Sequence, residues 1–249
     1  IQQDSLEVIR IHSVTQICRQ AEVHGRLSGS GFFNWHFFRF AGDFQLVVFE
    51  HCFIFQRLAD FMGFTEGLCA IAEEPEECYA LYEYLCDYNC EVLKNVCYWY
   101  KPDAVCIPDD TATARAPFIS PAAYKELVKP FHAREAEIVL NSGCYIDMHD
   151  CGHCEAFIDD WMDFGVTAWN PAQTSNDLVG IKKKWGRKLI ISGGWDSAST
   201  LTYDPADSET LREPLMKYVD DLAPNGGFIF SAFVMGKPDA NGKTPQEVV

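Results

Sequence analysis

The sequence predicts an α/β fold built around a parallel β-sheet, and three observations favour this fold class. Strand-like and helical patterns alternate from about residue 5 to residue 234. Each strand-like stretch is a short and continuously apolar run, which is typical of a parallel sheet covered by helices. Polar residues collect directly after these runs, where the βα loops of a (β/α) barrel form one rim and carry the chemistry. We therefore expect a candidate site at the carboxyl ends of the strands.

The expected elements alternate most regularly after residue 100. Strands are expected at 26–33, 104–108, 144–149, 166–170, 189–192 and 227–230. Helices are expected at 43–62, 75–100, 120–141, 155–164, 177–185 and 208–222, and another begins within 6–14. A closed barrel needs eight strands, so six indicate either that further units precede Ile1 in a longer chain or that the sheet is open. No linker-like, repeated or low-complexity segment divides the chain, and we expect residues 1–249 to form a single domain.

Composition and charge exclude several classes of protein. A chain of 249 residues with 48% hydrophobic content can bury a large core. Its formal charge of −16 makes nucleic acid and anionic membranes poor partners, because phosphate binding needs a basic surface. The chain contains no run of about 18 apolar residues and no signal-peptide pattern at its start. Eleven scattered cysteines, an odd number, fit reduced thiols better than a disulfide framework. We expect a soluble, cytoplasmic protein.

The motif His-Asp-Cys-Gly-His-Cys at residues 149–154 places metal-capable side chains just after an expected strand. Imidazole and thiolate are ligands that zinc prefers. His149 and Cys151 lie two residues apart, so on an extended segment they point to the same side, and Gly152 lets the chain turn away behind them. The pair makes half of a metal site. A satisfied histidine beside a buried free cysteine is an equal alternative for this pattern.

Several motifs in a fixed order carry a family resemblance. They are Ile119-Ser120-Pro121 with Tyr124, Lys129 and Pro130; His149-Asp150-Cys151-Gly152; Gly165-Val166 leading to Asn170-Pro171-Ala172-Gln173; and Gly193-Gly194-Trp195-Asp196. From about Gly31 to Val234 the chain resembles the uroporphyrinogen decarboxylase superfamily, and most closely its branch of cobalamin-dependent methyltransferases. The resemblance implies a TIM-type (β/α) barrel whose N-terminal part is missing here, because family members normally have further strands before the equivalent of Arg26.

The methyltransferase branch supplies the main functional hypothesis. The resemblance implies a zinc ion held by an H-x-C pair and a later cysteine, where it activates a substrate thiol for methyl transfer with a corrinoid carried by a partner protein. His149 and Cys151 match this pair. The chain departs from the family because no cysteine follows Cys154. Zinc would need a substitute ligand from Cys154, His153, Asp109, Asp110 or Glu50, and we take Cys154 as the first candidate.

Two alternatives stay open at this point. The decarboxylase branch acts without a cofactor on a substrate with many carboxylates, using an early aspartate, a tyrosine and a late histidine. No histidine follows His153, and a chain of charge −16 is a poor host for that substrate. The other alternative is a non-catalytic barrel that binds a small ligand or a partner. A homo-oligomer is a separate expectation about assembly and belongs to no one of these functions.

Other polar residues after the expected strands complete the candidate site. Asp109 and Asp110 follow one strand and are candidates for a general base or for binding substrate, although either could cap the following turn. Asn170 and Gln173 flank a proline in the loop that the family uses for its pocket, with turn stabilisation as the alternative. Gly193 and Gly194 would let backbone N–H groups approach a bound ligand, with Asp196 supplying charge; an ordinary tight turn is the alternative. We expect small-molecule chemistry at one rim formed by these residues.

Overall fold

A computed structural model describes residues 47–49, 53–195 and 208–231 and shows one parallel sheet in these ranges. Its six strands are hydrogen-bonded in the order β1-β2-β3-β4-β5-β6, which is also their order along the chain. They are β1 (Val47–Phe49), β2 (Ala104–Pro108), β3 (Tyr145–His149), β4 (Ala168–Gln173), β5 (Ile190–Gly194) and β6 (Phe228–Ser231). Every neighbouring pair is parallel. Strands that follow one another in both sequence and space, with helical connections, are the arrangement of a (β/α) barrel.

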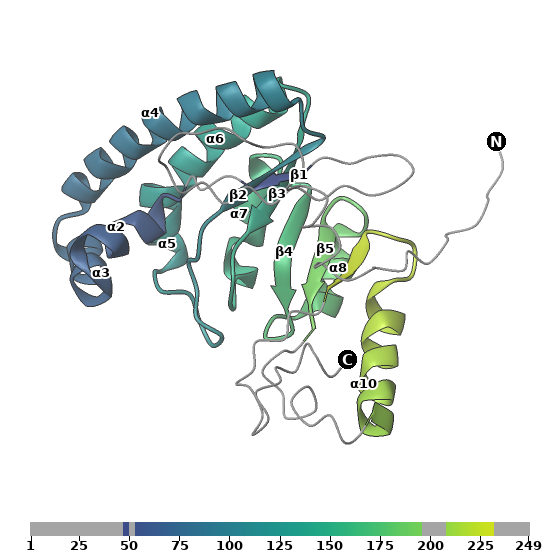
Figure 1. Cartoon of the computed structure of the whole chain (residues 1–249). Helices are drawn as coiled ribbons and strands as arrows, with labels where there is room; N and C mark the ends of the chain where they lie inside the picture. The colour runs from purple at the N-terminus through teal and green to yellow at the C-terminus, as the bar shows by residue number, and fades with distance from the viewer. Residues whose placement is uncertain (1–46, 50–52, 196–207, 232–249) are drawn as a thin grey trace, which may run out of the picture.

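The helices form the connections between these strands (Figure 1). They are α2 (Phe55–Met62), α3 (Phe64–Glu73), α4 (Pro75–Tyr100), α5 (Pro121–Ala123), α6 (Lys129–Asn141), α7 (Ile158–Asp163), α8 (Leu178–Trp185) and α10 (Ser208–Leu222). A π-helical turn at Tyr124–Val128 joins α5 to α6, and a 3₁₀ turn at Glu155–Phe157 precedes α7. Helices α4 and α6 pack side by side at one end of the sheet, and α10 packs against α8 near the other. In the described ranges, no helix has the length and apolar character needed to cross a membrane.

The two faces of the sheet differ in burial. Val105, Ile146 and Trp169 are fully buried and define the face that the helices cover. The alternate positions Asp147 and His149 are only partly buried and lie on the opposite face. Because side chains alternate along a strand, the polar side chains of β3 share the inner face of the partial barrel.

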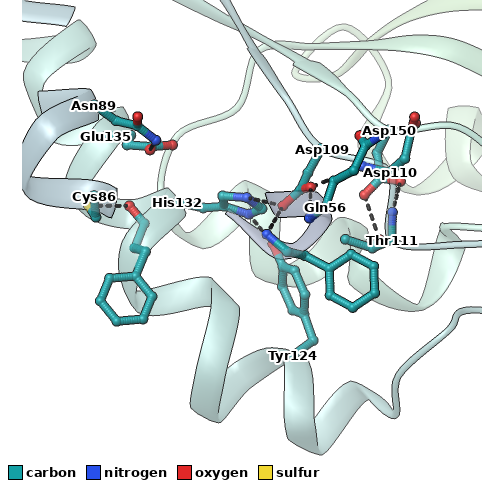
Figure 2. A network of polar contacts seen from close by, with 12 residues as sticks. Gln56, Cys86, Asn89, Asp109, Asp110, Thr111, Tyr124, His132, Glu135 and Asp150 are labelled. Atoms are coloured by element: carbon teal, nitrogen blue, oxygen red, sulfur yellow. Dashed lines mark hydrogen bonds and ion pairs between the residues drawn. The ribbon is translucent and has the colours of Figure 1, made fainter. Parts of the chain in front are cut away.

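Helix α4 meets α6 through a buried polar pair. Asn89 Nδ2 donates a 2.8 Å hydrogen bond to Glu135 Oε1, and the Glu135 side chain is completely buried (Figure 2). Its second oxygen, Oε2, has no hydrogen-bond partner among the described residues. Burial raises the pKa of Glu135 well above its usual value. The interface therefore contains an acid that resists ionisation.

The sequence interpretation is wrong for the first described segment. A single helix was expected at 43–62, whereas residues 47–49 form β1, paired with β2, and α2 begins only at Phe55. β-branched and aromatic residues in the run Val47-Val48-Phe49 favour a strand. The start of α2 is fixed by a residue distant in sequence, because the carboxylate of Asp109 accepts hydrogen bonds from the backbone N–H groups of Phe55 (2.8 Å) and Gln56 (3.0 Å).

The later elements are close to expectation. The strands expected at 104–108, 144–149, 166–170, 189–192 and 227–230 correspond to β2 through β6, with ends that differ by up to three residues. The helix expected at 120–141 is present with a π-helical turn inside it. The strand expected at 26–33 and the helix beginning within 6–14 lie outside the described residues.

Candidate metal centre

Three potential metal ligands converge at the carboxyl ends of β2 and β3. They are Asp110, His149 and Cys151, and one ligand atom from each lies within 4.8 Å of the others. The register explains the convergence, because Pro108 at the end of β2 pairs with His149 at the end of β3. Asp110 therefore leaves its strand beside the motif that follows the neighbouring strand. All three residues are partly exposed, so a ligand can reach them.

The geometry of this group fits a zinc ion. Cys151 Sγ lies 3.7 Å from His149 Nε2. Usual zinc–sulfur and zinc–nitrogen lengths around a tetrahedral ion place two such atoms about 3.6 Å apart. Nitrogen, sulfur and carboxylate oxygen are all accepted zinc donors, and three protein ligands leave the fourth position open. His149, Cys151 and Asp110 could therefore hold zinc in an open site.

A hydrogen bond fixes the ring of His149. Its Nδ1 lies 2.7 Å from Asn170 Oδ1 on β4, and the two residues are paired in the sheet register. An amide oxygen only accepts, so Nδ1 carries a proton in this contact, and Nε2 lies on the side of Cys151 as the nitrogen left to bind a metal. The Asn170 amide nitrogen lies 3.7 Å from Cys106 Sγ, which supports this orientation of the amide.

The loop that carries Cys151 depends on a glycine and two polar contacts. Gly152 has φ +96°, and a Cβ there would lie 2.6 Å from the backbone oxygens of both Ala112 and Thr113. Its N–H donates a 2.7 Å hydrogen bond to Gln173 Oε1, and the N–H of Cys151 donates to Asp110 Oδ1 at 3.1 Å. The expected turn at Gly152 is confirmed, and Gln173 holds the loop.

Asp150 anchors the motif to β2, a role that the sequence interpretation did not assign. It is fully buried, and its carboxylate accepts hydrogen bonds from Thr111 N (2.9 Å) and Thr111 Oγ1 (2.6 Å). Its backbone oxygen accepts from Trp169 Nε1 at 3.0 Å. Alternation could have revealed it, because a residue between His149 and Cys151 must point away from the ligands.

Cys154 does not join the group in the structure. Its fully buried thiol lies 3.0 Å from the Cys151 carbonyl oxygen and 3.3 Å from Asp150 Oδ1. Burial and the nearby Asp150 carboxylate raise its pKa. The turn at Gly152 directs Cys154 into the interior, and Asp110 takes the place expected of it.

Asp109, expected to face the same cavity as His149, is instead buried among structural partners. Besides the start of α2, its Oδ2 contacts His132 Nε2 at 3.1 Å, and His132 Nδ1 contacts the Tyr124 hydroxyl at 3.0 Å (Figure 2). Trp161 Nε1 donates to the same hydroxyl at 3.0 Å. Asp109, His132, Tyr124 and Trp161 have no significant exposure. This arrangement favours a structural role for Asp109.

Gly193 and Gly194 are explained by packing at the end of β5. A Cβ at Gly193 would meet the Tyr218 hydroxyl at 2.1 Å, and one at Gly194 would meet Pro171 Cβ at 3.2 Å and Gln173 Cγ at 3.3 Å. The Tyr218 hydroxyl itself is buried and has no hydrogen-bond partner among the described residues. A cofactor contact for these glycines stays a prediction. Asp196 lies outside the described residues.

Burial and nearby charges shift the pKa values of the acids and thiols around Asp110, His149 and Cys151. Burial, followed by the negative charge of Asp110, raises the pKa of Cys151 above its usual value. Burial also raises the pKa of Asp147, on the inner face of β3, to about 6, although a hydrogen bond with the Asn170 side chain and the nearby His149 oppose the shift. Without a metal, Cys151 is therefore a neutral thiol at pH 7.

These observations define the class of protein: part of a (β/α) barrel with partly buried polar groups at the rim where such barrels carry their chemistry. The chain belongs to the uroporphyrinogen decarboxylase (URO-D) family, whose model matches residues 57–232. The expected family is thus confirmed.

A solved structure shows the same fold. A methyltransferase from Methanosarcina mazei aligns with a TM-score of 0.57 and 14% sequence identity over 84% of this chain. The chain spans 57% of the length of that protein. No curated protein matches the sequence.

Proposed function

We propose that this protein is a methyltransferase-like enzyme of the URO-D family, which uses zinc to transfer a methyl group between a corrinoid protein and a small molecule. The observation that carries the proposal is the convergence of Asp110, His149 and Cys151 within 4.8 Å. The fold shared with the Methanosarcina mazei methyltransferase is consistent with it.

The chain's own residues have distinct tasks in this proposal. His149, held by Asn170, presents Nε2, and Cys151 presents its sulfur from the loop fixed by Gly152 and Gln173. Asp110 supplies a carboxylate oxygen in place of the family's late cysteine. A zinc ion bound by these groups would lower the pKa of a substrate thiol at the open position.

The methyl transfer itself needs no further group from the chain. In the direction of thiol methylation, a methylated corrinoid on the partner protein would supply the methyl group and keep the electron pair of the bond that breaks, and the substrate sulfur would form the new bond to the methyl group. The thiol proton goes to solvent. In this proposal, the role of the protein residues is to bind and orient the substrate thiol beside the methyl donor.

The proposal also covers the partner protein, the cellular location and the domain organisation. The partner is a corrinoid-binding protein that docks at the rim formed by the carboxyl ends of β2, β3 and β4. A cytoplasmic location is supported by the nine cysteines of the described residues, all of which are free thiols. We also propose that residues 1–249 belong to a single domain.

The direct test is an assay with methylcobalamin, a panel of small thiols and zinc-loaded protein, in which the loss of the methylcobalamin spectrum is followed. We expect zinc-dependent thiol methylation that Cys151→Ser abolishes and that Cys69→Ser, a change at an exposed cysteine, leaves intact. Equal rates for wild type and Cys151→Ser would contradict the proposal. Decarboxylation of uroporphyrinogen by the zinc-free protein would instead favour the other branch of the family.

A further inference from the structure

Two cysteine side chains meet on the buried face of α4, outside the candidate metal centre. Cys86 Sγ lies 3.8 Å from Cys90 Sγ, and the two residues are 0% and 7% exposed. Residues four apart lie on the same face of a helix, one turn from each other, which brings the two thiols together. The Cys86 thiol also donates to the Phe131 carbonyl oxygen on α6 at 3.6 Å (Figure 2). Nothing in the proposed methyl transfer uses this pair.

The separation of the two sulfur atoms distinguishes a disulfide from a metal bridge. A disulfide needs Cβ atoms about 3.5–4.5 Å apart, whereas Cβ atoms one helical turn apart lie about 5–6 Å from each other, so α4 would have to distort. Two bonds of about 2.3 Å, the usual zinc–sulfur length, place their sulfurs about 3.8 Å apart at a tetrahedral angle and about 4.6 Å apart on a straight line. The observed separation of 3.8 Å lies in this range. A metal ion can therefore join the two sulfurs without distorting the helix.

The set of donors favours a soft ion that needs few ligands. Among the described residues, no third histidine, cysteine or carboxylate forms a group of possible metal ligands with this pair. Zinc in a closed structural site takes four ligands. Thiolates select Cu(I) among the soft ions, and Cu(I) accepts coordination by two ligands alone. Two buried sulfurs therefore suit Cu(I) better than zinc.

Cations beside the pair reduce the cost of burying a negative charge, because two thiolates around one Cu(I) carry a net charge of −1. Arg134 on α6 contacts Asp87 at 2.5 Å, next to Cys86 in the chain, and Lys94 lies one turn beyond Cys90 on α4. The hydrogen bond with Cys86 lowers the pKa of Cys90, and the charges of Arg134 and Lys94 act in the same direction, while burial and Asp87 oppose the shift. Nearby cations favour the thiolates that bind metal.

We propose that Cys86 and Cys90 form a binding site for one Cu(I) ion, held between their sulfur atoms where α4 packs against α6. On binding, the two thiols become thiolates and release their protons to solvent. Neither copper nor sulfur changes its oxidation state. The site is independent of the proposed methyl transfer and of the group formed by Asp110, His149 and Cys151.

The test is the amount of Cu(I) that the full chain retains, without oxygen, in competition with the Cu(I) chelator bicinchoninate. All variants carry Cys151→Ser, which removes the thiol of the candidate metal centre. We expect Cys86→Ser and Cys90→Ser each to lose one Cu(I) per chain. Cys78→Ser, a change at another buried cysteine of α4, should lose none. Retention of the same amount of Cu(I) by folded Cys86→Ser as by the Cys151→Ser chain would overturn the inference.

X-ray absorption of the Cys151→Ser chain with one equivalent of Cu(I) decides the case even if Cys86→Ser and Cys90→Ser do not fold. We expect two sulfur neighbours around copper and no nitrogen or oxygen neighbour. Nitrogen or oxygen ligands would overturn the inference. A chain that retains no Cu(I) would overturn it too, and a disulfide between Cys86 and Cys90, detected by mass spectrometry after mild oxidation of that chain, would then identify a redox pair instead.

Discussion

Replacement of Gly152 by alanine tests whether this loop must approach β2 as closely as the structure shows. The new Cβ would lie 2.6 Å from two backbone oxygens, at Ala112 and Thr113, neither of which can rotate away as a side chain would. The φ of +96° adds the strain of a left-handed backbone. The backbone strain costs about 1–2 kcal/mol, and overpacking against fixed atoms costs about 1–3 kcal/mol more. We expect Gly152→Ala to lose about 2–5 kcal/mol of unfolding free energy.

Gly143 provides a matched control for this change. Its φ is +79°, and nothing lies within 4 Å of a Cβ built there, so Gly143→Ala meets the backbone strain without the clash. Urea unfolding of both variants isolates the steric part, which we expect to be about 1–3 kcal/mol. A Gly152→Ala variant no less stable than Gly143→Ala would refute the close approach of the loop to β2. A folded Gly152→Ala variant should also bind zinc more weakly, because the loop that presents Cys151 must shift.

Further variants test the burial of polar groups in the core. Because burial raises the pKa of Glu135, its contribution to stability is greatest at low pH and is lost as the pH rises toward its folded-state value, by at most about 1.4 kcal/mol per pH unit. The free energy of unfolding of Glu135→Gln, measured with urea relative to wild type, should therefore be higher at pH 8 than at pH 5. The exposed control Glu137→Gln should show no such change. A difference between Glu135→Gln and wild type that stays constant from pH 5 to pH 8 would contradict a raised pKa of Glu135. At β5, a Cβ added to Gly193 would meet the Tyr218 hydroxyl. Gly193→Ala should therefore lower stability more in the wild-type background than in the Tyr218→Phe background, where this hydroxyl is absent. Additive effects in this double-mutant cycle, measured by thermal unfolding, would show that the two groups do not meet.

The sequence predicts the parallel architecture because continuous apolar runs and helical periodicity are local patterns. The strands from residue 104 onward are recognised from such runs. The region before Phe55 is not, because its helix start depends on a carboxylate 54 residues away, that of Asp109. A cap supplied from a distant part of the chain leaves no local pattern beside the helix that it starts.

The same distinction holds for the candidate site. His149 and Cys151 are found from their spacing, and the turn at Gly152 follows from its residue type. The choice of Asp110 over Cys154 depends on strand register and on the direction in which the chain leaves the turn. Likewise, Asp109 is buried and Asp110 lies at the rim because the Asp109 carboxylate bonds to the start of α2 and to His132, which are contacts between distant parts of the chain.

The most direct test of the central claim is the zinc content and zinc affinity of the full chain. We expect one zinc ion per chain, and we expect both Cys151→Ser and Asp110→Asn to weaken binding by more than the roughly 100-fold that loss of an orienting residue can cause. Cys154→Ser should bind zinc as the wild type does, because its thiol is bonded in the interior. A wild-type chain that binds no zinc, or a loss of affinity in Cys154→Ser equal to that in Cys151→Ser, would contradict a metal site formed by Asp110, His149 and Cys151.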